Sequence, residues 1–204
     1  MKKIIISCVS LSLLSGVLLA QTSADKKAKI VAALQAGAKN AATQILDAQG
    51  RAQGDYDIVR HQWYEYEAPW HTGQIINGLL AAYEITHDKS FLAAARKAGD
   101  WWISLEYKDH PQLKGMLRAI HGDHVGNLIV TGTITDGTPG LFRLSRITGE
   151  RKYADCATRA GDWIIKNMYL ASEALIYDGL HPDTGTVMKD KSPFSSRNGS
   201  IYLR

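Results

Sequence analysis

The fold is decided by GLLAAYEITHDKSFLAAARKAGDWWI, residues Gly78 to Ile103, which returns 62 residues later as GLFRLSRITGERKYADCATRAGDWII, residues Gly140 to Ile165. The two copies align without a gap, and both contain the phrase Ala-Gly-Asp-Trp near their ends. Chance rarely produces such a match. A fixed period of this size marks a repeat architecture, in which each unit buries its apolar face against neighbouring units.

Each copy of the repeat predicts a pair of helices. Apolar residues recur at helical spacing on both sides of a break, at Thr86-His87-Asp88 in the first copy and at Thr148-Gly149-Glu150 in the second. A glycine such as Gly149 often ends a helix, and an acidic residue such as Asp88 or Glu150 suits the first turn of the next one. The repeat unit is therefore an antiparallel helical hairpin with a very short turn.

The beginning of the chain, residues 1–24, has the pattern of a secretory signal peptide. Lys2 and Lys3 precede an apolar run through Ala20, and small residues suited to cleavage follow at Thr22 and Ala24. The run is too short to span a bilayer comfortably, although an uncleaved anchor is the alternative. We expect a periplasmic or secreted product that has no contact with the membrane after cleavage.

Composition excludes several classes of protein. Loss of Lys2 and Lys3 with the signal peptide would lower the formal net charge from +4 to +2. A net charge this small does not indicate a nucleic-acid-binding protein. Cys8 would leave with the same segment, and Cys156 remains as one small residue that we expect to be buried. The sequence therefore predicts no disulfide framework, no metal centre and no cofactor.

The repeat also predicts how residues 25–204 are organised. Applying the same offset backwards makes Lys26 to Asp47 the second helix of an earlier, incomplete hairpin, so that the chain holds five long helices. Hairpins of this length usually close into an (α/α)6 toroid, an all-α ring that would need roughly 370 residues at six such units. We therefore expect the N-terminal part, about half, of a toroidal catalytic domain. An open half-ring that dimerises is the alternative, and the sequence leaves the oligomeric state open.

Aromatic and acidic residues collect in the first long connection, Gln49 to His71. Long connections leave one face of such a ring, and functional residues concentrate on loops held by a rigid frame. Trp63 and Trp70 lie there among tyrosines and carboxylates, as in a surface that stacks on sugar rings and hydrogen-bonds their hydroxyl groups. A hydrophobic plug that packs the loop onto the helices explains the same residues, and both interpretations stay open.

The best single catalytic candidate is Asp136, in Thr-Ile-Thr-Asp-Gly-Thr-Pro-Gly. We expect it at the start of the first helix of the second hairpin, with Pro139 at an early helical position. An N-cap carboxylate is the simpler interpretation of its spacing. One repeat earlier, Gln74 aligns with Asp136 and His71 lies close by, so two helix openings would point polar side chains into one cavity. A carboxyl group there would be partly desolvated, as a general acid or base often is.

The second long connection, Tyr107 to Thr135, holds the cluster His121-Gly122-Asp123-His124. This spacing matches none of the usual zinc patterns, so we assign His121, Asp123 and His124 to hydrogen bonding with substrate rather than to a metal. Arg143 could pair with the carboxylate of a uronic acid, because a guanidinium binds carboxylates in bidentate fashion. An ordinary solvated charge is the alternative for Arg143.

The phrase Ile-Thr-Gly-Glu-Arg-Lys-Tyr-Ala-Asp, which follows Ile-Thr-Asp-Gly by a short apolar helix, resembles the unsaturated glucuronyl and rhamnogalacturonyl hydrolases, glycoside hydrolase families 88 and 105. The similarity covers about residues 60 to 170. Those enzymes are secreted or periplasmic (α/α)6 toroids. The resemblance places His71 at the opening of an inner helix, although Thr72 stands where the family carries a second Asp.

The resemblance implies an activity for Asp136. In those families the matching Asp is the general acid and base that hydrates the C4=C5 double bond of a 4,5-unsaturated uronic acid, which a polysaccharide lyase leaves behind. The implied partner is an oligosaccharide. Two alternatives remain: another sugar-active toroid, such as an epimerase, a β-arabinofuranosidase or a lyase, and a glycan-binding fragment without catalysis.

Overall fold

The structure, a computed structural model, describes residues 5–64, 67–120, 127–189 and 200–202, with side chains for all of these except 5–22 and 200–202. Its helices are α1 (Ile5–Asn40), the π-helical turn η1 (Ala41–Ile45), α2 (Ala68–Thr86), α3 (Lys89–Ser104), α4 (Thr131–Thr148) and α5 (Arg151–Met168). The strands are β1 (Tyr56–Asp57), β2 (Gln62–Trp63), β3 (Ile129–Val130), β4 (Tyr169–Leu170), β5 (Leu175–Tyr177), β6 (Gly179–Leu180) and β7 (Ser200–Tyr202). Helices therefore dominate, and the short strands lie in the connections.

The two predicted hairpins are confirmed as α2–α3 and α4–α5. Gly149 ends α4 in the left-handed conformation at φ 76°, and its N–H donates to the carbonyl oxygen of Ser145 at 2.8 Å. The carboxylate of Asp88 caps α3 by accepting a hydrogen bond from the N–H of Ser90. Each turn is thus fixed by local backbone chemistry.

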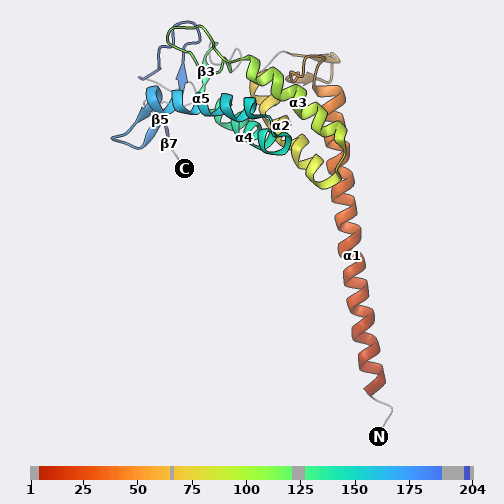
Figure 1. The fold of residues 1–204 in the computed structure, drawn as a ribbon. Helices are drawn as coiled ribbons and strands as arrows, with labels where there is room; N and C mark the ends of the chain where they lie inside the picture. The colour runs from red at the N-terminus through yellow and green to blue at the C-terminus, as the bar shows by residue number, and fades with distance from the viewer. Residues whose placement is uncertain (1–4, 65–66, 121–126, 190–199, 203–204) are drawn as a thin grey trace.

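The hairpins form two layers, with α2 and α4 inside and α1, α3 and α5 outside (Figure 1). Within the inner layer α2 and α4 run parallel, because contacts between them advance together along both helices, from Gly73 with Gly137 to Glu84 with Arg146. The end of α1 packs against α2, while its beginning projects away from the body (Figure 1). The predicted outer helix over Lys26 to Asp47 is confirmed as far as η1.

Glycines allow the inner helices to approach each other closely. A Cβ atom on Gly137 would lie 2.2 Å from the indole of Trp102, and one on Gly140 would lie 3.0 Å from the side chain of Ile76. Gly78 is the counterpart of Gly140 one repeat earlier, and no atom of the described structure lies within 4 Å of its would-be Cβ. The same glycine is therefore packed in one copy and open in the other.

The outer helices α3 and α5 are joined by polar side chains as well as by the core. The hydroxyl of Tyr153 donates to the Asp100 carboxylate at 2.9 Å, Arg96 pairs with Glu150, and the guanidinium of Arg159 holds both carboxylate oxygens of Glu106. Beneath these pairs Trp102, Leu144 and Cys156 are buried. The sequence predicted a buried Cys156, and the structure confirms this. In the part of the chain that the structure describes, no helix is both long enough and apolar enough to cross a bilayer.

The start of α4 differs from its prediction. The helix begins at Thr131, so Asp136 is its sixth residue rather than its N-cap, and Pro139 lies inside the helix rather than near its beginning. The reason is tertiary. Antiparallel pairing of β3 with β6 brings Asp178 beside the helix start, where its carbonyl oxygen accepts a hydrogen bond from the N–H of Thr131 at 2.8 Å.

Candidate functional site

Asp136 and Trp70 connect the two inner helices near their beginnings. The indole Nε1 of Trp70, in the first turn of α2, donates to a carboxylate oxygen of Asp136 at 2.6 Å. This short distance fits a charge-assisted hydrogen bond. The sequence placed both residues in the site by different arguments, and the structure brings them into direct contact.

The position of Trp70 is fixed from beneath. The indole nitrogen of Trp102, which is fully buried on α3, donates to the carbonyl oxygen of Pro69 at 2.6 Å. The same indole lies against Gly137, the residue after Asp136. One buried side chain therefore holds the first turn of α2 and the second turn of α4 at once, which sets the distance between Trp70 and Asp136.

His71 extends the site from Trp70 toward the groove beside α1. Its ring stacks with that of Trp70 at a centroid separation of 5.7 Å and an interplanar angle of 29°. The Nε2 atom of His71 is buried, and it has no hydrogen-bond partner among the described residues. Buried polar atoms ordinarily have a hydrogen-bond partner, so this nitrogen is an exception beside the groove.

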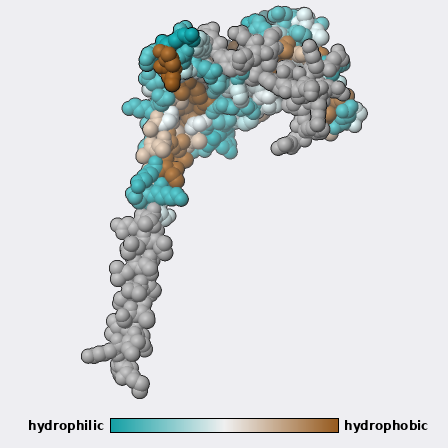
Figure 2. Space-filling model, turned by 180° about the vertical axis from the view of Figure 1, so that it is seen from behind, coloured by the Kyte–Doolittle hydropathy of each residue, from teal (hydrophilic) through white to brown (hydrophobic). Residues whose placement is uncertain are grey.

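A groove of about 590 Å³ between α1, η1 and α2 collects three of the predicted binding residues, Trp63, His71 and Gln74. Its remaining wall is mostly apolar, from Leu34, Ile75 and other small or aliphatic side chains. Figure 2 shows apolar surface on the body beside α1. An aromatic ring, a histidine and an amide along an apolar groove suit a sugar, which offers both C–H faces and hydroxyl groups.

The hairpin of β1 and β2 holds Trp63 at the groove. Tyr56 pairs with Trp63 across the two strands, and their rings lie 4.9 Å apart at 56°. The turn between them is fixed by Asp57, whose carboxylate accepts hydrogen bonds from the N–H groups of Val59 and Arg60 at 2.8 and 3.0 Å. Tyr56 is partly exposed, so the pair presents an aromatic edge next to the groove.

One prediction about the site needs correction. We expected the carboxyl group of Asp136 to be partly desolvated, but this residue is exposed in the structure. The carboxylate is held instead by the hydrogen bond that it accepts from the Trp70 indole. The guanidinium of Arg143, which we predicted to bind substrate, pairs with Glu84 and donates to the carbonyl oxygen of Asn77 at 3.3 Å. Its predicted role in substrate binding stays a prediction.

Arg143 lies seven residues after Asp136, which is about 10 Å along the helix axis. Its contacts join α4 to the far end of α2, so its role in this structure is to hold the inner helices together. The other loop candidates, His121, Asp123 and His124, lie outside the described residues. Their predicted role in substrate binding stays a prediction.

Two carboxylates of the long connections, to which the sequence assigned no specific role, are buried near the helix openings. Glu67 is 5% exposed and immediately precedes α2, while Asp178 is 3% exposed and lies beside the start of α4. Acidic residues are rarely buried to this extent unless they are paired. The aromatic residues next to Glu67 in the sequence could have indicated that it is buried. The position of Asp178 depends on the pairing of β3 with β6, which the sequence does not reveal.

Comparison with known proteins identifies the fold class. No family model matches the sequence, and no curated protein matches it. Among solved structures, the chain is similar to a GH76 α-mannanase from Bacteroides thetaiotaomicron, with 26% identity and a TM-score of 0.50 over 58% of this chain and 32% of that one. A sugar epimerase from a ruminal bacterium matches with 13% identity and a TM-score of 0.55, over 72% of this chain and 40% of that one.

An unsaturated glucuronyl hydrolase specific for heparin also matches, over 81% of this chain and 54% of that one, with 14% identity and a TM-score of 0.36. The chain thus spans less than two thirds of each of these proteins. The mannanase and the epimerase confirm the predicted fold class: this chain has the fold of part of an (α/α)6 toroid of the glycosidase type. The narrower resemblance to families 88 and 105 is not confirmed.

Proposed function

We propose that this chain carries part of the active site of an exported sugar-active enzyme, in which Asp136 is the general acid and base. The hydrogen bond from Trp70 to Asp136 is the observation that carries this proposal. It places a carboxylate on one inner helix against an aromatic residue of the neighbouring inner helix. Next to this pair, the groove with Trp63, His71 and Gln74 offers a surface for the sugar.

The proposed reaction is hydration of the 4,5-unsaturated uronyl residue at the end of an oligosaccharide. In its acid form Asp136 donates a proton to C4, and a water molecule adds its oxygen to C5 while giving a proton back to the carboxylate. The hemiketal formed at C5 then opens, and the shortened oligosaccharide leaves. The step consumes one water and regenerates the carboxyl group, so it needs no cofactor and no second carboxylate as nucleophile.

The surroundings of Asp136 fit a group that must exchange protons with water. Its carboxylate is exposed, so a water molecule can reach it, and the Trp70 indole fixes one of its oxygens while leaving the other for the substrate. The ring of His71 stacks on Trp70 and lines the neighbouring groove, which links Asp136 to the proposed sugar surface. These features support positioned proton transfer at the junction of α2 and α4.

The experiment compares the parent protein with Asp136→Asn on unsaturated oligosaccharides from a lyase digest. We expect the parent to remove the absorbance of the unsaturated uronate and Asp136→Asn to lose at least about 100-fold in rate, because proton transfer by a side chain contributes about 10² to 10⁴. Asp109→Asn, on an exposed loop residue, is the matched control. Turnover that persists in Asp136→Asn would remove Asp136 from the mechanism.

A glycosidase acting on α-mannosides is the second candidate, favoured by the 26% identity with the mannanase. That chemistry ordinarily requires two carboxyl groups flanking the scissile bond. Asp136 would then need a partner, for which Glu67 and Asp178, both buried near the helix openings, are candidates. Release of reducing sugar from α-mannan without any change in uronate absorbance would favour this second function over hydration.

Export is part of the proposal and has its own test. If residues 1–24 are a signal peptide, the protein recovered from the periplasm or the medium begins near Asp25. N-terminal sequencing of that protein decides the matter, because an intact Met1 would leave the segment attached.

A further inference from the structure

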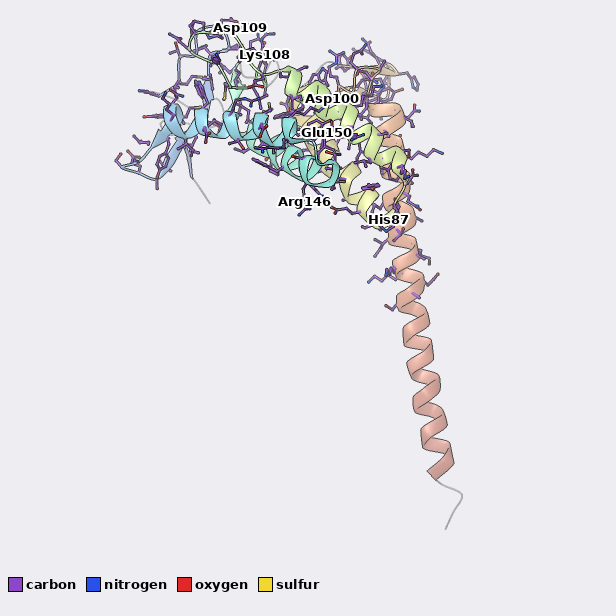
Figure 3. All side chains as sticks on the ribbon, viewed as in Figure 1. His87, Asp100, Lys108, Asp109, Arg146 and Glu150 are labelled. Atoms are coloured by element: carbon purple, nitrogen blue, oxygen red, sulfur yellow. The ribbon has the colours of Figure 1, made fainter. Side chains whose placement is uncertain are left out.

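The outer layer holds a second and larger hollow, remote from the junction of Trp70 and Asp136. It is a cleft of about 1250 Å³, formed by the connection after α3, the second half of α5 and residues 185–189. Pockets for small molecules usually measure about 300 to 1,000 Å³, so a cleft of this volume suits an extended ligand. Figure 3 shows Lys108, one of its lining residues, well away from His87 and Arg146.

The charge of this cleft is strongly positive. Four lysines line it: Lys108, Lys114, Lys166 and Lys189. Arg159 and Glu106 also line it but neutralise each other, because the guanidinium donates to both oxygens of that carboxylate. Asp162 is the remaining acidic residue of the wall, so four positive charges face one negative charge.

The lysines are available for an outside ligand. Lys108, Lys114 and Lys166 are all exposed, and none of them forms an ion pair with a described residue. Exposed like charges gathered around one hollow repel each other and raise the local concentration of anions. A lysine ammonium binds carboxylate and sulfate groups as a compact point charge with three donors.

Two aromatic residues give the cleft a fixed wall. The hydroxyl of Tyr107 donates to the carbonyl oxygen of Pro182 at 2.8 Å, and the Nε1 of Trp163 donates to the carbonyl oxygen of Gln112 at 2.9 Å. Since their polar atoms are already used inside the protein, these side chains offer the ligand ring surface rather than hydrogen bonds. Ring surface beside cations fits a chain of sugar rings that carries negative charges.

We propose that this cleft binds a linear polysaccharide bearing carboxylate or sulfate groups, as an anchoring site separate from the site at Asp136. A nucleic acid would also be drawn to positive charge, but the formal charge of the whole chain, +4, falls short of a nucleic-acid-binding surface. The proposal does not depend on catalysis by Asp136, because the lining residues of the two sites are different.

The test uses the full chain and polygalacturonate, a linear polymer with one carboxylate per sugar, with neutral dextran as the uncharged polymer. A cleft variant carries Lys108→Gln, Lys114→Gln and Lys166→Gln. The matched control carries Lys26→Gln, Lys27→Gln and Lys39→Gln, three exposed lysines of α1 that do not line the cleft. Binding is measured by titration calorimetry at low and at physiological salt, together with turnover on the unsaturated oligosaccharide.

We expect the parent to bind polygalacturonate but not dextran, and the cleft variant to bind about tenfold more weakly, because several salt-screened charge contacts are lost together. The control should bind as the parent does, and turnover of a short substrate should be unchanged in both variants. Equal weakening in the two variants would show a general charge effect and overturn the proposal. Binding of single-stranded DNA as tight as that of polygalacturonate would overturn it as well.

Discussion

A Cβ atom added to Gly73 would lie only 2.5 Å from the Cα of Gly137, so α2 and α4 touch backbone against backbone where their functional side chains stand. Trp70 lies three residues before Gly73 and Asp136 one residue before Gly137. The close contact therefore brings an indole nitrogen and a carboxylate oxygen within hydrogen-bond distance. Packing of the inner layer and geometry of the candidate site depend on the same two glycines.

Replacing Gly137 tests this packing. We expect Gly137→Ala to lower the free energy of unfolding by about 1–3 kcal/mol, because its Cβ would overlap the buried Trp102 indole. Gly161→Ala is the control: Gly161 is exposed within α5, and nothing of the described structure lies within 4 Å of its would-be Cβ. There alanine should raise stability by about 0.5–1 kcal/mol through helix propensity. Urea unfolding midpoints compare the two, and equal effects would contradict the close contact.

The variant Trp70→Phe tests the role of the Trp70 hydrogen bond separately from that of its aromatic ring. Phenylalanine can keep the stack on His71 but has no donor for Asp136, so we expect the rate of sugar turnover to fall about tenfold, as for loss of one hydrogen bond to a charged group. The Michaelis constant should change less than the turnover number. Trp101→Phe, in a partly buried ring on α3, serves as the control for loss of an indole. A variant that weakens binding but leaves turnover intact would assign Trp70 to substrate contact instead.

The pair of Glu106 and Arg159 predicts a pH dependence of stability. The Arg159 guanidinium, by hydrogen bonding, holds the pKa of Glu106 below its ordinary value of 4.5. A carboxyl group whose pKa is lower in the folded protein stabilises the fold above that ordinary value, and the contribution is lost as the pH falls through the folded pKa. Glu106→Gln should therefore lower stability by about 1 kcal/mol at pH 7, and this difference should shrink as the pH falls below 4.5. A constant difference across this range, measured by urea unfolding, would contradict the ion pair.

Cys156 should be nearly inert in the folded protein. Burial, together with the nearby Glu106 carboxylate, raises the pKa of the Cys156 thiol to about 12 from its ordinary 9.0. At pH 8 the thiolate is then roughly 1,000-fold scarcer than in the unfolded chain, and the thiolate is the reacting species. A disulfide reagent applied to protein carrying Cys8→Ser should modify Cys156 only after urea unfolding. Because this pKa is raised, the thiol's contribution to stability declines as the pH rises from about 9 toward 12.

The hairpins were predictable because their signals are local. Apolar spacing, the left-handed Gly149 and the Asp88 cap act within a few residues, and the repeat presents most of this pattern twice. The start of α4 was predicted about five residues too late, since Thr131, Gly132 and Thr133 are poor helix formers. Their helical conformation is imposed by the strand pairing of β3 with β6 and by the hydrogen bond from Thr131 to Asp178.

The sequence predicted which helix openings lie together, but not the individual side-chain contacts between them. Trp70, His71 and Asp136 do lie together, because the offset of the repeat correctly placed two helix openings side by side. The role of Arg143 depended on which neighbour its side chain would reach, and Glu84 lies across the interhelical contact, where no sequence spacing reveals it. The burial of Glu67 and Asp178 depends in the same way on loops that fold back over the helix openings.

Gly140 is packed against Ile76, whereas its counterpart Gly78 meets nothing of the described structure within 4 Å. The two duplicated segments thus leave different room for a side chain at the same position of the repeat. Gly78→Leu should leave the free energy of unfolding nearly unchanged while filling part of the groove that holds Trp63, His71 and Gln74, whereas Gly140→Leu should destabilise the fold. A shared position in the repeat therefore predicts where a residue lies along its helix, but not whether the surrounding structure leaves space for a larger side chain.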